Sequence, residues 1–176
     1  MKERIEVMLS EEEVDVKIKE MADQISKDYE GKTVHLVCVL KGSVFFVCEL
    51  AKRIKVPVTL DFMSVSSYGK ETKSSGVVKI IKDLDEPLKG KDVLVVEDII
   101  DSGRTLSYLL ELLRDREPNS LHLCTLLDKP DRRVVPVEVD YTGFEIPDKF
   151  VVGYGLDYDQ RYRNLPYVGV VNFDEE

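Results

Sequence analysis

The chain has 176 residues, of which 43% are hydrophobic and 34% are charged, as expected for one soluble domain with a sizeable core. Its formal net charge of −9 argues against a general nucleic-acid binder, which needs a basic face. No apolar run approaches the ~20 residues of a membrane-spanning helix, and the charged first residues differ from a signal peptide, so we expect no membrane partner.

Helical and strand patterns alternate over the first two-thirds of the chain. The sequence Ser-Glu-Glu-Glu at 10–13 predicts a capping box, and apolar residues then follow at helical spacing until Gly31. The apolar run over 34–40 is typical of a buried parallel strand, and 44–54 is expected to be a helix. Further strands are predicted over 58–65, 77–81, 93–96 and 121–127, with a helix over 105–114.

The last quarter of the chain consists of short β-like pieces broken by Pro and Gly, over 134–135, 137–139, 150–152 and 168–171. Strands that alternate with helices predict an α/β fold, with a mostly parallel twisted sheet flanked by helices on both faces. We expect a single domain over 1–176. Its core would span about 30–130, and a small C-terminal hood would combine about 131–176 with N-terminal residues.

Three cysteines, Cys38, Cys48 and Cys124, lie in apolar surroundings without C-x-x-C spacing. We expect buried, reduced and structural thiols, which indicate a cytoplasmic protein. His35 and His122 also lie in apolar runs, where a histidine is more often a core or edge residue than a catalyst. Neither histidine is assigned a role.

Residues 93–105, VLVVEDIIDSGRT, are the most informative stretch. An apolar strand leads into Glu97 and Asp98, and Asp101 then opens a Gly-containing turn before a helix. The N–H groups of such a junction suit a phosphate, and the carboxylates suit hydroxyls or hydrated Mg²⁺. The combination predicts a phosphorylated ribose as ligand. The alternative is an ordinary strand–turn–helix with solvated charges.

This motif resembles the signature of the type I phosphoribosyltransferases, which bind 5-phosphoribosyl-1-pyrophosphate (PRPP). Four more segments narrow the resemblance to the 6-oxopurine phosphoribosyltransferases: LKG at 40–42, SSYG at 66–69, LLDKP at 126–130 and GFEIPDKFVVGYGLDY at 143–158. The resemblance implies the type I fold. It also implies Mg²⁺-dependent transfer of phosphoribose from PRPP to N9 of hypoxanthine or guanine, which gives IMP or GMP and pyrophosphate.

The resemblance assigns a first group of residues to PRPP and Mg²⁺. The loop at 40–42, with a cis peptide bond between Leu40 and Lys41, and the cation Arg163 would bind pyrophosphate. The turn at 101–105 would hold the 5-phosphate, and family members often carry Lys where Arg104 stands. Glu97, Asp98 and Asp157 would be the metal-binding acids. The complete set is Leu40, Lys41, Gly42, Glu97, Asp98, Asp101, Ser102, Gly103, Arg104, Thr105, Asp157 and Arg163.

A second group would bind the purine. Asp101 stands where the family carries its general acid/base near purine N7. Lys129 would donate to O6, because an ammonium group only donates and so selects a 6-oxo over a 6-amino group. Phe150 would stack on the base, Val151 would meet its edge through the backbone, and Asp157 would reach its exocyclic edge.

The polar stretch 66–76 would form a lid in which Ser67 and Tyr68 close over PRPP and exclude water. The resemblance also implies a homo-oligomer, a dimer or a tetramer, with the Lys41 loop near the subunit contact. Two alternatives stay open: a transferase that favours xanthine, and a regulator of the same fold that senses PRPP and binds nucleic acid. The sequence leaves the preference between hypoxanthine and guanine open.

Overall fold

The computed structural model describes residues 2–67 and 77–174, and these ranges contain a six-stranded sheet, a three-stranded sheet and three α-helices. The large sheet has the order β4-β3-β2-β5-β6-β7, and only β3 and β4 are antiparallel neighbours in it. Its strands, in that order, are Val78–Lys82, Val58–Ser67, Val34–Leu40, Asp92–Ile100, Ser120–Asp128 and Tyr141–Glu145. The mostly parallel α/β sheet is confirmed.

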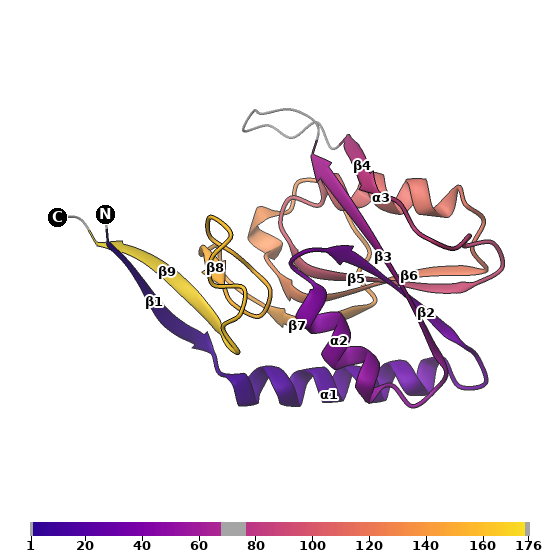
Figure 1. The fold of residues 1–176 in the computed structure, drawn as a ribbon, viewed down its shortest axis with the longest axis horizontal. Helices are drawn as coiled ribbons and strands as arrows, with labels where there is room; N and C mark the ends of the chain where they lie inside the picture. Colours follow the sequence, from indigo (N-terminus) through magenta and orange to yellow (C-terminus); the bar gives the residue numbers. More distant parts are fainter. Residues whose placement is uncertain (1, 68–76, 175–176) are drawn as a thin grey trace.

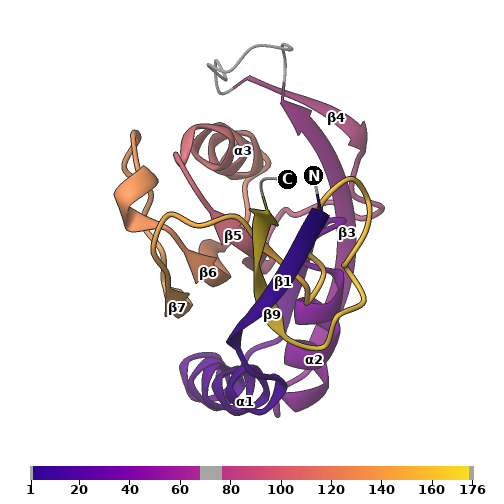
Figure 2. The same ribbon diagram turned by 90° about the vertical axis from the view of Figure 1, so that its left-hand side faces the viewer.

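Helices cover both faces of this sheet: α1 (Glu11–Asp28) and α2 (Val44–Arg53) on one face and α3 (Arg104–Arg114) on the other (Figures 1 and 2). Successive residues of a strand point to opposite faces. Thus Leu94 of β5 packs in the core beneath α1 and α2, whereas Val93 and Val95 pack beneath α3. Burial on both sides explains why the strands are continuous apolar runs.

The capping box at the start of α1 is confirmed. Ser10 Oγ accepts a hydrogen bond from the Glu13 N–H at 3.1 Å, and Glu13 Oε1 accepts one from the Ser10 N–H at 3.4 Å. The buried stripe of α1 includes Val14, Ile18 and Ile25 at helical spacing. The helix therefore begins where the sequence predicts and rests its apolar face on the sheet.

The three-stranded sheet is antiparallel and has the order β1-β9-β8, in which β1 is Lys2–Leu9, β9 is Val168–Asp174 and β8 is Val151–Val152. It lies at one end of the molecule, where the two termini are close together (Figure 1). N-terminal residues thus share a sheet with C-terminal residues. The division of the chain into a core and a hood stays a prediction.

Some sequence-based predictions about local structure were wrong. Residues 134–135 and 137–139 are not strands. Val134 and Val135 donate their N–H groups to Ser102 O and not to a neighbouring strand. Cys48 is exposed, since it points away from the face on which α2 buries Phe46, Val47 and Leu50. The extra strands β1 and β7 were not predicted.

None of the helices within the described residues is long and apolar enough to cross a membrane.

Candidate active site

The turn between β5 and α3 has the geometry of an anion site. Gly103 precedes α3 with φ = 82°, a left-handed conformation that favours glycine. A Cβ at this position would lie 2.7 Å from Val135 O, so the neighbouring chain also leaves room only for glycine. Within the turn, the Arg104 N–H donates to Ser102 Oγ at 3.3 Å. A helix of 11 residues therefore begins where its amino end can meet a phosphate.

Residues 129–135, which we call the buttress, donate hydrogen bonds to the carbonyl groups of this turn. The N–H groups of Val134 and Val135 donate to Ser102 O at 2.9 and 3.1 Å. Arg133 Nε donates to Asp101 O at 3.2 Å, and the Arg133 guanidinium forms an ion pair with the buried carboxylate of Asp128. The carbonyl groups of the turn are thus fixed by a segment that starts at Lys129.

Glu97 and Asp98 lie near the end of β5. Burial raises the pKa of Glu97 well above its ordinary value, with the neighbouring Asp98 charge as a second cause, and burial also raises the pKa of Asp98. The loop at 40–42 packs directly on Asp98: a Cβ at Gly42 would lie 1.7 Å from Asp98 Oδ2. The peptide bond between Leu40 and Lys41 is cis, as the family resemblance implied.

The acid pair fits a magnesium ion that substrate helps to hold. Burial raises the pKa values of both adjacent carboxylates, and the positive charge of Arg163 lowers the pKa of Asp98 without offsetting that burial, so a divalent ion would supply further positive charge. Among residues 2–67 and 77–174, no group of three or more His, Cys, Asp or Glu side chains forms a ready-made metal cage. Mg²⁺ commonly uses one or two carboxylates together with water and substrate phosphates, so the residues fit it.

A cavity of about 380 Å³ lies beside the turn. It is lined by all five residues that the family resemblance assigned to the base: Asp101, Lys129, Phe150, Val151 and Asp157. Three different regions supply them, namely the end of β5, the end of β6 and the stretch around β8. The remaining lining residues are Ile99, Arg132, Asp148 and Leu156. We call this space the base cavity.

The groups in the base cavity differ in exposure. Lys129 is only 8% exposed, and its Nζ lies 3.7 Å from Asp101 Oδ1. Phe150 is 49% exposed and meets the Tyr158 ring edge-on, with 5.6 Å between ring centroids. A buried cation and an exposed aromatic face are thus available to the same ligand.

A second cavity, of about 610 Å³, is lined by Leu40, Lys41 and Arg163 together with neighbouring residues. Arg163 Nη2 lies 3.3 Å from Asp157 Oδ1, so an ion pair connects this cavity with the base cavity. The loop at 40–42 and the stretch that contains Gly155 are in close contact, since a Cβ at Gly155 would lie 2.0 Å from Gly42 O.

The structure tests little of the predicted lid. Ser67 is the last residue of β3 and its backbone pairs with Val78 of β4. Tyr68 lies outside the described residues, so the lid role of this pair stays a prediction.

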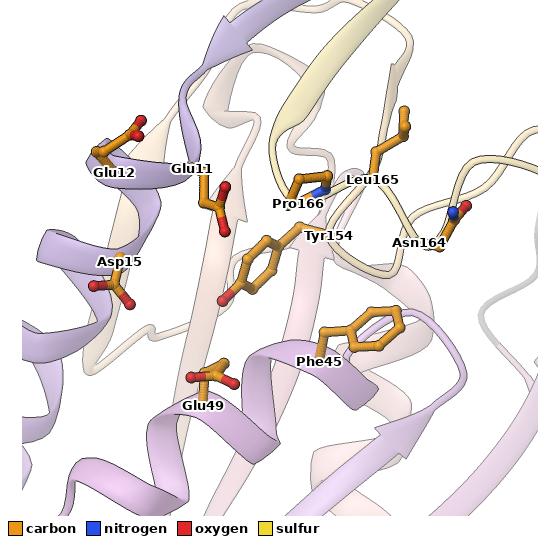
Figure 3. Close-up of a pocket in the computed structure, with 9 residues that line it drawn as sticks. All are labelled: Glu11, Glu12, Asp15, Phe45, Glu49, Tyr154, Asn164, Leu165 and Pro166. Carbon is orange, nitrogen blue, oxygen red and sulfur yellow. The ribbon is translucent and has the colours of Figure 1, made fainter.

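A third cavity, of about 620 Å³, lies between α1, α2 and the loop at 164–166 (Figure 3). Tyr154 projects into it, and burial raises the pKa of Tyr154 to about 12. Its acidic lining repels phosphates, so it is a poor candidate for a nucleotide site despite its size. The acids are Glu11, Glu12, Asp15 and Glu49.

Comparisons with known proteins agree with this geometry. A family model described as a phosphoribosyl transferase domain matches residues 8–159. The hypoxanthine phosphoribosyltransferase of Salmonella typhimurium is 55% identical, and the alignment covers 99% of this chain and 100% of that protein. The hypoxanthine-guanine phosphoribosyltransferase of Bacillus subtilis is 54% identical over 97% of this chain and 96% of the relative.

Solved structures give the same picture. A hypoxanthine phosphoribosyltransferase from Staphylococcus aureus superimposes with a TM-score of 0.92 at 51% identity, covering 95% of this chain and 91% of the other. A hypoxanthine-guanine phosphoribosyltransferase from Bacillus anthracis, with a HEPES molecule in its active site, superimposes with a TM-score of 0.93 at 49% identity. The alignment covers 96% of this chain and 100% of the other. The range of the family match includes the acid pair, the turn and the base cavity.

Proposed function

This chain belongs to the phosphoribosyl transferase family, and we propose that it moves the 5-phosphoribosyl group of PRPP to N9 of hypoxanthine or guanine. The products are IMP or GMP and pyrophosphate, and the reaction is a transferase step of purine salvage. One observation carries the proposal: the base cavity is lined both by the buried Lys129 and by Asp101, the first residue of the phosphate turn. A base and a sugar phosphate can therefore bind side by side.

The phosphate turn would bind the 5-phosphate through its backbone amides and the hydroxyl groups of Ser102 and Thr105, close to the amino end of α3. Arg104 adds a cation to the same turn. The buttress supports this assignment, since it fixes the carbonyl groups of Asp101 and Ser102 from behind. A turn held in this way has little freedom to lose when the phosphate binds.

Glu97 and Asp98 would bind the ribose hydroxyl groups and Mg²⁺, and Asp157 would reach the metal from the pyrophosphate side. The bound ion supplies positive charge that neutralises and orients the leaving pyrophosphate. The pyrophosphate would also bind to Lys41, to the amides of the loop at 40–42 and to Arg163. The pair between Arg163 and Asp157, at 3.3 Å, supports this arrangement because it holds the guanidinium at the border of the two cavities.

The base would stack on Phe150, a contact worth about 1–3 kcal/mol, and its edge would meet the backbone of Val151. Lys129 would donate to O6. Asp101 would take up or orient the proton at N7, which makes N9 a better nucleophile toward the sugar carbon. The 3.7 Å separation of Asp101 Oδ1 and Lys129 Nζ supports both roles, since the purine O6 and N7 are neighbouring positions on one edge of the base.

We also propose that the protein is a homo-oligomer, a dimer or a tetramer, in the cytoplasm. The Lys41 loop would lie near the subunit contact. Phe45 supports this, because it is 42% exposed beside Leu40 and Lys41 on the wall of the second cavity, and exposed aromatic surface is typical of interfaces. Light scattering on the purified protein measures the oligomer directly.

A spectrophotometric assay with PRPP, Mg²⁺ and one purine at a time tests the proposed function. We expect turnover with hypoxanthine, guanine or both, and little with adenine. Turnover with xanthine above that with the other bases would replace the proposed substrate. No turnover with any purine, together with tight and salt-sensitive binding of RNA or DNA in a gel shift, would contradict the proposal.

A further inference from the structure

We propose that Asp148 is a positioning residue for Lys129: it holds the lysine ammonium at the 6-position of the bound base and so contributes to selection of 6-oxopurines. This inference rests on the proposed function and assigns a role to a side chain that the sequence analysis left without one. Asp148 lines the base cavity together with the five residues assigned to the purine.

The Lys129 ammonium lies between two carboxylates that come from different parts of the fold. Asp101 Oδ1 is 3.7 Å from Lys129 Nζ, and Asp148 Oδ1 is 3.9 Å from the same atom. Asp101 follows β5, whereas Asp148 follows β7. The lysine itself follows β6, the strand between them in the sheet.

Two further contacts hold Asp148 in this position. Its second carboxylate oxygen, Oδ2, lies 3.5 Å from Arg132 Nη1. Two residues before it, the Ile146 N–H donates to Asp128 O at 2.8 Å and ties the segment to the end of β6. Asp148 therefore approaches Lys129 from a fixed stretch of backbone although its side chain is 51% exposed.

A buried ammonium needs acceptors, because its desolvated N–H donors are costly to leave unpaired. Without a base, the two carboxylates offset the ammonium charge as ion-pair partners, at 3.7 and 3.9 Å, which is longer than a hydrogen bond. When a 6-oxopurine binds, O6 accepts one donor and Asp101 turns to the proton at N7. Asp148 is then the carboxylate that stays with the ammonium and keeps it in place.

Loss of the Asp148 charge would leave Lys129 paired with Asp101 alone. A base would have to break that pair before O6 and N7 could be recognised, so the apparent affinity for the base would fall. Rejection of adenine would fall too, since it requires an ammonium opposite the 6-amino group. PRPP would be affected little, because its phosphates bind to the turn and to the Arg163 side of the site.

The test compares Asp148→Asn, Asp148→Glu and the control Asp115→Asn, which removes the same charge from an exposed residue after the last turn of α3, outside the buttress and the base cavity. For Asp148→Asn we expect KM for hypoxanthine to rise about tenfold and the ratio of kcat/KM for hypoxanthine over adenine to fall about tenfold. KM for PRPP should change by less than about twofold. Asp148→Glu should recover part of the selectivity, and Asp115→Asn should match the wild type.

The outcomes separate this inference from the proposed function. If the wild-type enzyme is active and Asp148→Asn resembles Asp115→Asn, the positioning role is wrong while the proposed function stands. Equal changes of KM for hypoxanthine and for PRPP, without recovery by Asp148→Glu, would show a merely structural residue and also overturn the role. A wild-type protein that uses no purine would overturn the proposed function and this inference with it.

Discussion

Asp101 has two tasks in this site. Its backbone carbonyl accepts from Arg133 Nε at the start of the phosphate turn, and its carboxylate faces the base cavity 3.7 Å from Lys129 Nζ. The first task belongs to the backbone and the second to the side chain. A substitution that keeps the backbone and the size of the side chain can therefore separate phosphate binding from proton transfer.

Asp101→Asn is expected to keep PRPP binding and to lower kcat about 100-fold or more, because an amide cannot take up the proton that leaves the purine. Calorimetric titration of PRPP with Mg²⁺, alongside single-turnover kinetics, measures the two properties separately. Unchanged turnover in this variant would remove the acid/base role of Asp101.

Single residues also show where sequence reasoning stopped. The five residues assigned to the base were named by resemblance to the motifs, and they line one cavity. Asp148 and Arg132 line it too, although nothing in the sequence set them apart from solvated loop charges. The position of Asp148 follows from the pairing of β6 with β7, a long-range contact that no local pattern encodes.

At the scale of elements, the buttress links two functions. It begins at Lys129, whose N–H donates to Ile100 O at 3.0 Å, and continues to Val135, whose N–H donates to Ser102 O. The lysine assigned to the base and the turn assigned to the phosphate are thus parts of one hydrogen-bonded unit. The sequence suggested strands for 134–135 and 137–139, because β-like residues at 134–135 do not reveal that their N–H groups bind a carbonyl of the turn.

Arg133→Met is expected to raise KM for PRPP about tenfold with a smaller change in KM for hypoxanthine, since it frees the Asp101 carbonyl and leaves the buried Asp128 unpaired. Steady-state kinetics with each substrate varied in turn measures this split. Arg116→Met is the matched control, because Arg116 also pairs with a carboxylate, that of Asp83, outside the site. Equal PRPP KM values in the two variants would contradict the role of the buttress.

Asp61 ties strand β3 to the turn after β4. Burial opposes its charge, but backbone N–H groups of Glu86, Asp85 and Phe62 outweigh burial and lower the pKa of Asp61 below 3.8. A lowered pKa in the folded state contributes stability above pH 3.8, and this contribution is lost as the pH falls through the folded-state pKa.

Asp61→Asn should therefore lower the free energy of unfolding at pH 7 by roughly 1–3 kcal/mol, and the difference from wild type should narrow below pH 3.8. Urea unfolding between pH 7 and pH 3 measures both values. The exposed Asp85 of the same turn provides the control, since Asp85→Asn should change the unfolding free energy by less than about 0.5 kcal/mol. A difference that stays constant to pH 3 would contradict this interpretation.

At the scale of the whole molecule, the site lies between two sheets that form differently. The alternation of strands and helices predicted the large sheet apart from β7, because each βα unit is local. The small sheet joins β1 to β9 across almost the whole chain. Its first strand carries charges at 2–4 and at 6, so its local pattern is not that of a strand. Residues 2–9 form a strand because they pair with β9, although their sequence shows little strand pattern.

The small sheet also matters for the site. β8 contains Val151, and β8 pairs with β9, so the two ends of the chain position one wall of the base cavity. The opposite walls come from the ends of β5 and β6. A ligand that contacts the phosphate turn and Lys129 at once must therefore lie between the two sheets.

A crystal structure of the complex with IMP is the most direct test of a nucleotide site between the phosphate turn and Lys129. We expect the 5-phosphate on the amides of residues 102–105, the purine ring against Phe150, and O6 within hydrogen-bonding distance of Lys129 Nζ. Density for IMP in the acidic cavity between α1 and α2, or a base turned away from Lys129, would contradict the account.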